Sequence, residues 1–144
     1  MKYIKETFVV SLLACSTAAW SHTGATGVVK ERMDQFKESK ASIKVLKKAL
    51  KAQHFAVITK EATAINRWAK QLTKAFPIGS NPHPSEALDS IWQEFDQFEH
   101  KAKAQINASE NLRKAGMSQD IKDARAAFEQ LTKSCKSCHE NYRE

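Results

Sequence analysis

Apolar residues recur along most of the chain at alternating spacings of three and four, the period of an amphipathic helix. The rhythm is cleanest in the segment that contains Phe55, Ile58, Ala62, Ile65, Ala69, Leu72 and Phe76. Three further segments, over residues 29–50, 88–112 and 121–142, carry the same kind of pattern. The pattern predicts four helices that bury one apolar stripe each.

Residues that stop or start helices separate these segments. All three prolines of the chain lie between residues 77 and 84, which cannot continue a helix and therefore form a long central connection. Ser85 is typical of the N-cap of the third helix, and Gly116 of that helix's end. Ser118 and Asp120 fit the start of the fourth. Helices joined in this way predict an all-α fold, an antiparallel four-helix bundle over residues 22–144.

Composition supports a compact helical protein. The 144 residues are 42% hydrophobic and 27% charged, with only four glycines and three prolines. The length suits one domain with room for a removable leader. No segment after the leader is apolar and long enough to span a bilayer.

The first 21 residues read as an export signal. Lys2 and Lys5 form a short basic start, and an apolar stretch over residues 8–18 follows. Small residues come next, so we expect cleavage near Ala19 or Ser21 and a periplasmic location. The alternative is lipid anchoring, because residues 12–15 end in Cys15 and resemble a lipoprotein cleavage box; the shortness of the apolar stretch before Cys15 favours ordinary cleavage.

Net charge bears on the partners. Removing residues 1–21 changes the formal charge from +7 to 7 − 2 + 1 = +6, because Lys2, Lys5 and Glu6 leave with the leader. A mildly basic protein favours an acidic redox partner protein. Lys and Arg alternate with Asp and Glu along the helices and do not form one cluster, so no nucleic-acid partner is expected.

One motif near the C-terminus carries chemistry. Cys135, Cys138 and His139 form the C-x-x-C-H signature of covalent haem attachment. Two thioether bonds fix the macrocycle, and the adjacent imidazole becomes an axial ligand of the iron. On a helix, positions i, i+3 and i+4 share one face. That face is the apolar stripe of the fourth segment, so we expect one haem c within the bundle.

Other uses of the two cysteines are poorer. Structural zinc needs four ligands, and no second Cys/His pair has matching spacing. A thioredoxin-like site expects a preceding strand, whereas this motif ends a helical pattern. A disulfide between residues three apart would close a loop too small to stabilise much.

The chain after the leader resembles the cytochrome c′ family of exported haem-c four-helix bundles. The resemblance is carried by Val28–Met33, Phe76-Pro77 with Gly79-Ser80, Ile91-Trp92 with Phe95 and Phe98, Cys-Lys-x-Cys-His at 135–139, and Tyr142-Arg143. It implies thioether bonds at Cys135 and Cys138 and His139 as the proximal ligand. It further implies that Arg143 lies near the proximal face.

The resemblance also implies which residues approach the haem from the first helix. Arg32 and Met33 match its haem contacts, and the residue four after Arg32 faces the distal side of the iron. That residue is methionine in low-spin relatives and a non-ligating apolar residue in high-spin ones. Here it is Phe36, which cannot coordinate a metal. Met33 shares roughly the same helix face and is the alternative sixth ligand.

These residues predict a periplasmic c-type cytochrome with an open distal site. It would transfer electrons or bind a small gas, nitric oxide or carbon monoxide. The alternative is a low-spin electron carrier with Met33 as sixth ligand. An enzyme is not expected, because the pattern places no distal histidine or catalytic acid opposite His139. Relatives often pair through their first two helices, so a homodimer is a further expectation.

Overall fold

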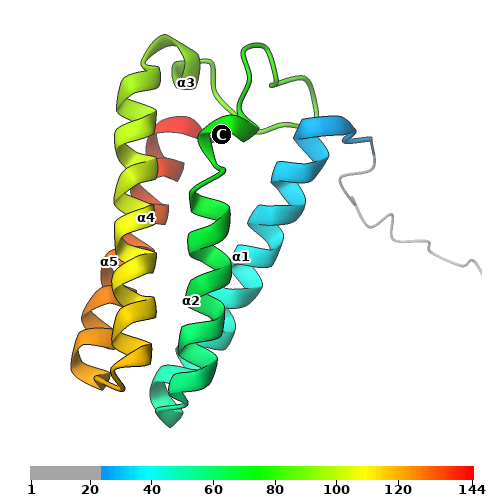
Figure 1. The fold of residues 1–144 in the computed structure, drawn as a ribbon. Helices are drawn as coiled ribbons and strands as arrows, with labels where there is room; N and C mark the ends of the chain where they lie inside the picture. The colour runs from blue at the N-terminus through cyan, green and yellow to red at the C-terminus, as the bar shows by residue number, and fades with distance from the viewer. Residues whose placement is uncertain (1–23) are drawn as a thin grey trace, which may run out of the picture.

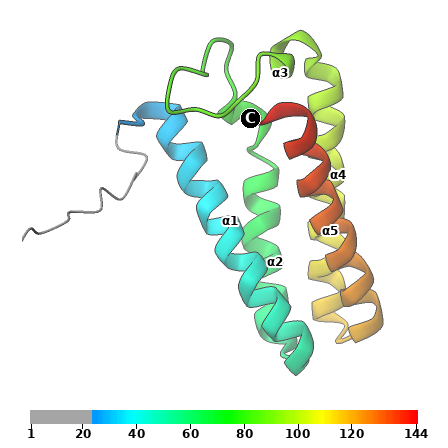
Figure 2. The ribbon, with the colours of Figure 1, turned by 180° about the vertical axis from the view of Figure 1, so that it is seen from behind.

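The computed structural model describes residues 24–144, and four long antiparallel helices dominate them. They are α1 (Gly27–Ala52), α2 (Phe55–Ala69), α4 (Phe95–Met117) and α5 (Ile121–Tyr142). A 3₁₀ turn η1 (Thr73–Ala75) and a four-residue helix α3 (Ser90–Gln93) lie in the central connection. Figures 1 and 2 show α1 and α2 as one pair and α4 and α5 as the other. The expected all-α four-helix bundle is confirmed, and the signal peptide expected over residues 1–21, with Cys15, lies outside the described residues.

The two ends of the bundle differ in what they hold. The upper end in Figure 1 gathers the start of α1, the central connection and the C-terminal end of α5. The lower end holds only the short turns between α1 and α2 and between α4 and α5. A site formed by residues of several elements is therefore expected at the upper end.

The second helix is shorter than its pattern. The α-helix stops at Ala69, and the chain tightens into η1 before Phe76. Leu72 and Phe76 are nevertheless buried, with 3% and 7% of their surface exposed. The 3₁₀ turn keeps both side chains directed into the core, which explains why the apolar rhythm outlasts the α-helix.

The start of the third helix is a correction. Ser85 does not cap a helix; its hydroxyl accepts from the backbone N–H of Ala87 at 3.1 Å. The chain first forms α3 and breaks at Glu94 before α4 begins. The residues expected to open the helix pair instead with the C-terminus, where the N–H of Leu88 donates to the carbonyl of Tyr142 at 3.1 Å.

The turn between α4 and α5 confirms one expected cap and corrects another. Asp120 caps α5, and its carboxylate accepts from the N–H of Asp123 at 2.9 Å. Gly116 lies inside α4 and does not end it. A Cβ there would meet the hydroxyl of Thr59 at 2.6 Å and its backbone nitrogen at 3.0 Å. Glycine is therefore required for the close approach of α4 to α2.

Two apolar clusters fill the bundle. The lower one is mostly aliphatic and consists of Leu46, Ala49, Leu50, Ile58, Ala62, Ile65, Ala108, Leu112, Ala115, Ala124, Ala127 and Leu131. The upper one is mostly aromatic and consists of Trp68, Leu72, Phe76, Ile91, Phe98, Ala102 and Tyr142, with Phe36, Trp92 and Phe95 packed against it. We call these the lower and upper clusters. Among the described helices, none has the length and apolar character of a membrane span.

Gly116→Ala tests the close approach of α4 and α2. Alanine gains about 1 kcal/mol of helix propensity, whereas overpacking costs about 1–3 kcal/mol. Because both the side chain and the backbone of Thr59 close the space, we place the overpacking cost in the upper part of that range, about 2–3 kcal/mol. The expected net loss in the free energy of urea unfolding is then about 1–2 kcal/mol. Thr59→Ala in the same background should recover part of it. A Gly116→Ala protein as stable as the parent would contradict this packing.

Candidate functional site

The C-x-x-C-H motif occupies the last two turns of α5. Cys135 and Cys138 are free thiols and half-buried, and Cys135 packs against the lower cluster. Between them, Ser137 accepts a hydrogen bond from the ammonium of Lys101 on α4 at 2.6 Å. The motif therefore stands on a helix held against its neighbour, at the boundary between the two clusters.

The central connection fixes the end of α5. The N–H of Glu144 donates to the carbonyl of Glu86 at 3.0 Å, and the hydroxyl of Ser90 donates to the carbonyl of Asn141 at 3.1 Å. Arg143 forms an ion pair with Glu86. The structure thus places Arg143 just beyond His139, paired with the connection.

An aromatic ring on α1 lies opposite His139. The centroids of the Phe36 and His139 rings are 6.4 Å apart, and the rings meet edge to face. Phe36 also meets Trp68 on α2 at 5.5 Å and Phe76 at 6.4 Å. Met33 is half-buried one turn earlier on α1. The α1 residue whose ring contacts His139 is therefore Phe36, the position expected to face the iron.

Arg32 is the most buried charged side chain of the site. Only 3% of its surface is exposed, and its guanidinium lies 4.5 Å from the centre of the Phe76 ring. It donates to the hydroxyl of Ser80 at 2.7 Å, to the Ser80 carbonyl, to the hydroxyl of Ser85 at 2.6 Å and to the Ala75 carbonyl at 3.3 Å. Burial lowers the pKa of Arg32, yet an arginine this far above neutrality stays charged. The positive charge is held by neutral acceptors, and no carboxylate is among its hydrogen-bond partners.

Burial shifts the pKa values of the three ionisable groups of the motif. Burial raises the pKa of Cys135 and of Cys138, so both remain protonated thiols near neutral pH. Rapid disulfide exchange needs a thiolate and is therefore slowed at both cysteines. Partial desolvation, and then the charge of Arg143, lower the pKa of His139. The neutral imidazole that results is the form that ligates metals. Within residues 24–144, no three His, Cys, Asp or Glu side chains come together as a metal cluster.

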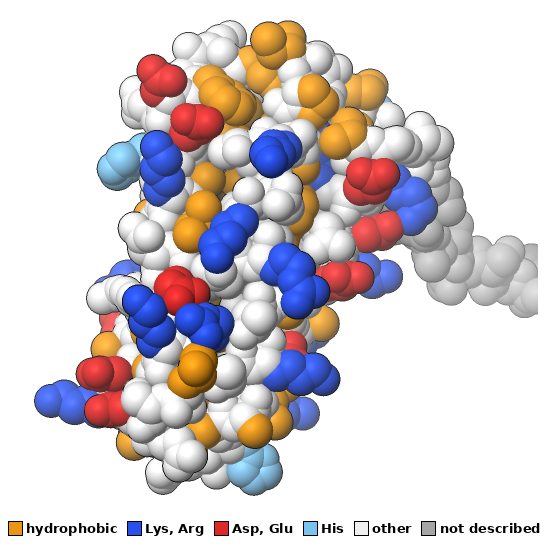
Figure 3. Space-filling model, in the orientation of Figure 1, with side chains coloured by type: hydrophobic (Ala, Val, Ile, Leu, Met, Phe, Trp, Pro, Cys, Tyr) orange, Lys and Arg blue, Asp and Glu red, His pale blue; other side chains and the backbone are white. Residues whose placement is uncertain are grey.

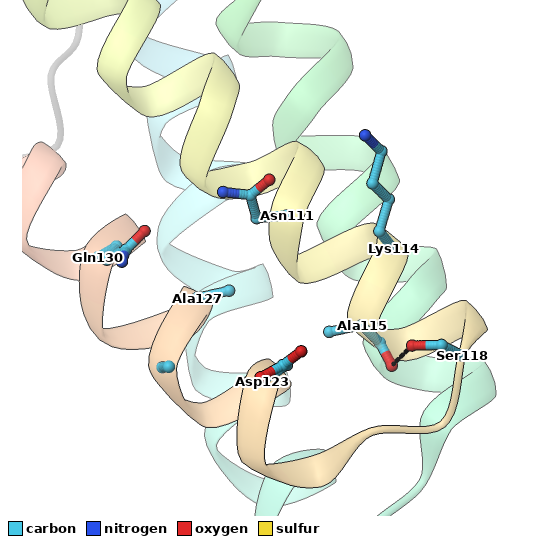
Figure 4. Close-up of a pocket in the computed structure, with 8 residues that line it drawn as sticks. Asn111, Lys114, Ala115, Ser118, Asp123, Ala127 and Gln130 are labelled. Atoms are coloured by element: carbon cyan, nitrogen blue, oxygen red, sulfur yellow. Dashed lines mark hydrogen bonds between the residues drawn. The ribbon is translucent and has the colours of Figure 1, made fainter.

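Among the described residues, one hollow between α4 and α5 is lined in part by Ser134 and Ser137 and therefore lies beside the two cysteines. Another groove, of about 310 Å³, lies between α4 and α5, lined in part by Asn111, Lys114 and Asp123. Figure 4 shows its polar side chains spread apart, with the Ser118 hydroxyl turned back to the Ala115 carbonyl at 3.3 Å. None of the predicted site residues lines it. It offers no convergent chemistry.

The structure brings together most of the predicted site. The ring of Phe36 contacts that of His139, and Arg143, four residues further on, pairs with Glu86 of the central connection. Arg32 is bonded to the same connection through Ser85. Ser80 and Ser85, which hold Arg32, were not predicted as site residues. No sequence signal identifies them, because they lie 48 and 53 residues from Arg32 along the chain.

Comparison with known proteins points to one family. The family model described as Cytochrome C' matches residues 27–143. A cytochrome c-556 of Agrobacterium fabrum is 30% identical over 122 residues, which cover 83% of this chain and 82% of that protein. A cytochrome c' of Pararhodospirillum photometricum is 31% identical over 119 residues, which cover 81% and 95% respectively.

Solved structures show the same fold. Cytochrome c prime from Shewanella frigidimarina superposes with a TM-score of 0.75 at 28% identity, over 81% of this chain and 94% of that one. A nitric oxide complex of a mutant cytochrome c prime from Alcaligenes xylosoxidans gives 0.74 at 25% identity, over 81% and 93%.

Arg32→Lys tests the role of the buried guanidinium. Lysine keeps the charge but cannot reproduce the planar fork that reaches Ala75, Ser80 and Ser85. We expect a loss of about 1.5–3 kcal/mol in the free energy of guanidinium-chloride unfolding. Lys30→Gln is the matched control: its exposed pair with Asp34 contributes at most about 1 kcal/mol. Equal effects of the two changes would contradict an anchoring role for Arg32.

Proposed function

The chain belongs to the cytochrome c′ family, and on that premise we propose that Cys135, Cys138 and His139 hold its haem c, with an open coordination position facing Phe36. The protein is a c-type cytochrome with covalently bound haem, serving electron transfer or gas binding. The observation that carries the finer proposal is the ring of Phe36, 6.4 Å from that of His139 on the facing helix.

The residues present fit the cofactor. Two free thiols and an imidazole share one face of α5, and an aromatic ring without a donor atom faces the imidazole. The buried guanidinium of Arg32, which has no carboxylate among its hydrogen-bond partners, lies at the same end of the bundle. We propose that it offsets the negative charge of the haem carboxylates. Bound haem c supplies an iron that changes oxidation state and binds diatomic gases.

The chain's own residues set what that iron can do. Cys135 and Cys138 fix the macrocycle, and His139 supplies a neutral nitrogen because desolvation and Arg143 lower its pKa. Phe36 has no donor atom and cannot ligate the iron, so the sixth coordination position would stay free for a small uncharged gas. Nitric oxide is the ligand we propose, since a related cytochrome c prime has a nitric oxide complex. Carbon monoxide has the same shape and suits experiments.

We propose no enzymatic reaction for the protein. The residue whose ring contacts that of His139 is Phe36, which can act neither as an acid nor as a base. The competing proposal is the low-spin electron carrier, in which Met33 is the sixth ligand. Met33 is half-buried on α1, and the ring contact of Phe36 with His139 favours the open position.

Location and partners follow from the sequence and the surface. We propose export to the periplasm through the signal peptide of residues 1–21. Figure 3 shows Lys and Arg side chains spread over one face of the bundle among a few Asp and Glu, which suits an acidic redox partner better than nucleic acid. Apolar side chains gather near the upper end in that view, where Ile78 of the central connection is 91% exposed. A homodimer remains a proposal from the resemblance.

Covalent attachment gives the first test. Haem colour should stay with the polypeptide after denaturation and acid–organic extraction, because thioether bonds survive both. Cys135→Ala or Cys138→Ala should lower the yield of mature holoprotein, measured as the haem absorbance per protein. Pigment that extracts freely from the parent would refute the assignment of both cysteines.

Met33→Leu and Phe36→Met test the distal side. Met33→Leu conserves volume and removes the sulfur, so the spin state and the affinity for carbon monoxide should change little. Phe36→Met places a thioether opposite His139 and should shift the iron toward low spin and weaken gas binding. Visible absorption spectra and gas titrations measure both. A low-spin parent that becomes high-spin on Met33→Leu would overturn the proposal in favour of the electron carrier.

A further inference from the structure

Two buried side-chain donors lack a hydrogen-bond partner among the described residues: the indole nitrogen of Trp68 and the hydroxyl of Tyr142. Both belong to the upper cluster, which surrounds the site, and neither belongs to the lower cluster. Buried donors are seldom left unpaired, because the lost hydration is not repaid. We therefore look for a group that accepts a hydrogen bond from each of these donors in the protein with its haem.

Trp68 lies on the side of the site opposite His139. Its side chain is on α2, only 8% exposed, and its ring meets that of Phe36 edge to face at 5.5 Å. Helices α1 and α2 form one pair, and α5, the helix that contains His139, belongs to the other pair (Figure 2). Tyr142 is on the helix of His139 itself and packs on Phe98 at 5.3 Å. Of the two donors, only Trp68 belongs to the distal wall.

We propose that the indole N–H of Trp68 donates a hydrogen bond to a small diatomic ligand bound at the distal face of the haem. This inference rests on the open distal position proposed above. Phe36 supplies shielding without a donor, and Trp68 beside it supplies one donor without a charge. The acceptor exists only while the ligand is bound, so ligand binding relieves the unpaired N–H. The distal pocket then discriminates by polarity as well as by size.

A haem carboxylate is the other acceptor the cofactor brings. The structure favours the ligand, because Trp68 contacts Phe36, the residue facing His139, whereas the buried cation Arg32 already offers a partner for a carboxylate. The two acceptors have different signatures, which the experiment separates.

Trp68→Phe in the reduced holoprotein, with carbon monoxide as the probe, tests the assignment. Phenylalanine keeps an aromatic ring and removes the N–H. The C–O stretching frequency should rise, and carbon monoxide should dissociate about two- to tenfold faster, the range for one net hydrogen bond. Without gas, the thermal unfolding midpoint of Trp68→Phe should equal that of the parent, because the N–H that is removed makes no hydrogen bond in the gas-free protein.

Trp92→Phe is the matched control. The indole of Trp92, packed against the same cluster, donates to the carbonyl of Phe76 at 3.0 Å. Its removal should leave the C–O stretch and the dissociation rate unchanged. The same variant allows a second measurement that does not depend on how Trp68→Phe folds: the indole N–H of Trp68, observed by nitrogen-15 NMR, should shift downfield when carbon monoxide binds.

The contrary results are distinct. One contrary result is an unchanged C–O stretching frequency in Trp68→Phe together with a shifted reduction potential. It would mean that the indole N–H donates to a haem carboxylate, and it would refute the proposal. An unchanged stretch, dissociation rate and indole signal would refute it as well. If the parent protein binds no carbon monoxide, the open distal position is itself wrong, and the assignment of Trp68 fails with it.

Discussion

The burial of the Arg32 guanidinium is the constraint on which the upper end of the bundle depends. A charge with 3% exposure must be hydrogen-bonded, and its partners come from η1 and the central connection. That connection in turn bonds to the last residues of α5 through Glu86 and Leu88. The hydrogen bonds of Arg32 on α1 and those of the central connection together link α1 to the end of α5, where His139 lies opposite Phe36.

The lower and upper clusters differ in their packing and in their unpaired polar atoms. The lower cluster is built from small and branched aliphatic residues, and Gly116 lets α4 approach α2 closely. Such packing is dense and stabilises the fold without leaving polar atoms unpaired. The upper cluster is aromatic and leaves the N–H of Trp68 and the hydroxyl of Tyr142 unsatisfied. Unpaired groups at one end of an otherwise satisfied core agree with the proposal that the haem binds at that end.

The electrostatics of the motif follow from its position on α5. Partial burial keeps the thiols of Cys135 and Cys138 protonated, and Arg143 adds to the desolvation that keeps His139 neutral. A neutral imidazole is the form of histidine that can ligate a metal. The distal wall that we propose, Phe36 with the indole N–H of Trp68 beside it, is likewise uncharged.

The sequence by itself determined the helices, the family and the motif, because these depend on local spacing. The period of three and four is a property of one helix, and C-x-x-C-H places its members on one face whatever surrounds them. Asp120 was predictable as a cap for the same local reason. Only the tertiary structure decided the roles of Ser85, Gly116 and Trp68. Ser85 was expected to cap a helix and is a hydrogen-bond partner of Arg32, and Gly116 was expected to end a helix and lies at a contact between two helices. The unpaired indole N–H of Trp68 is visible only in the structure. Each of these roles depends on a neighbour dozens of residues away, which no local pattern encodes.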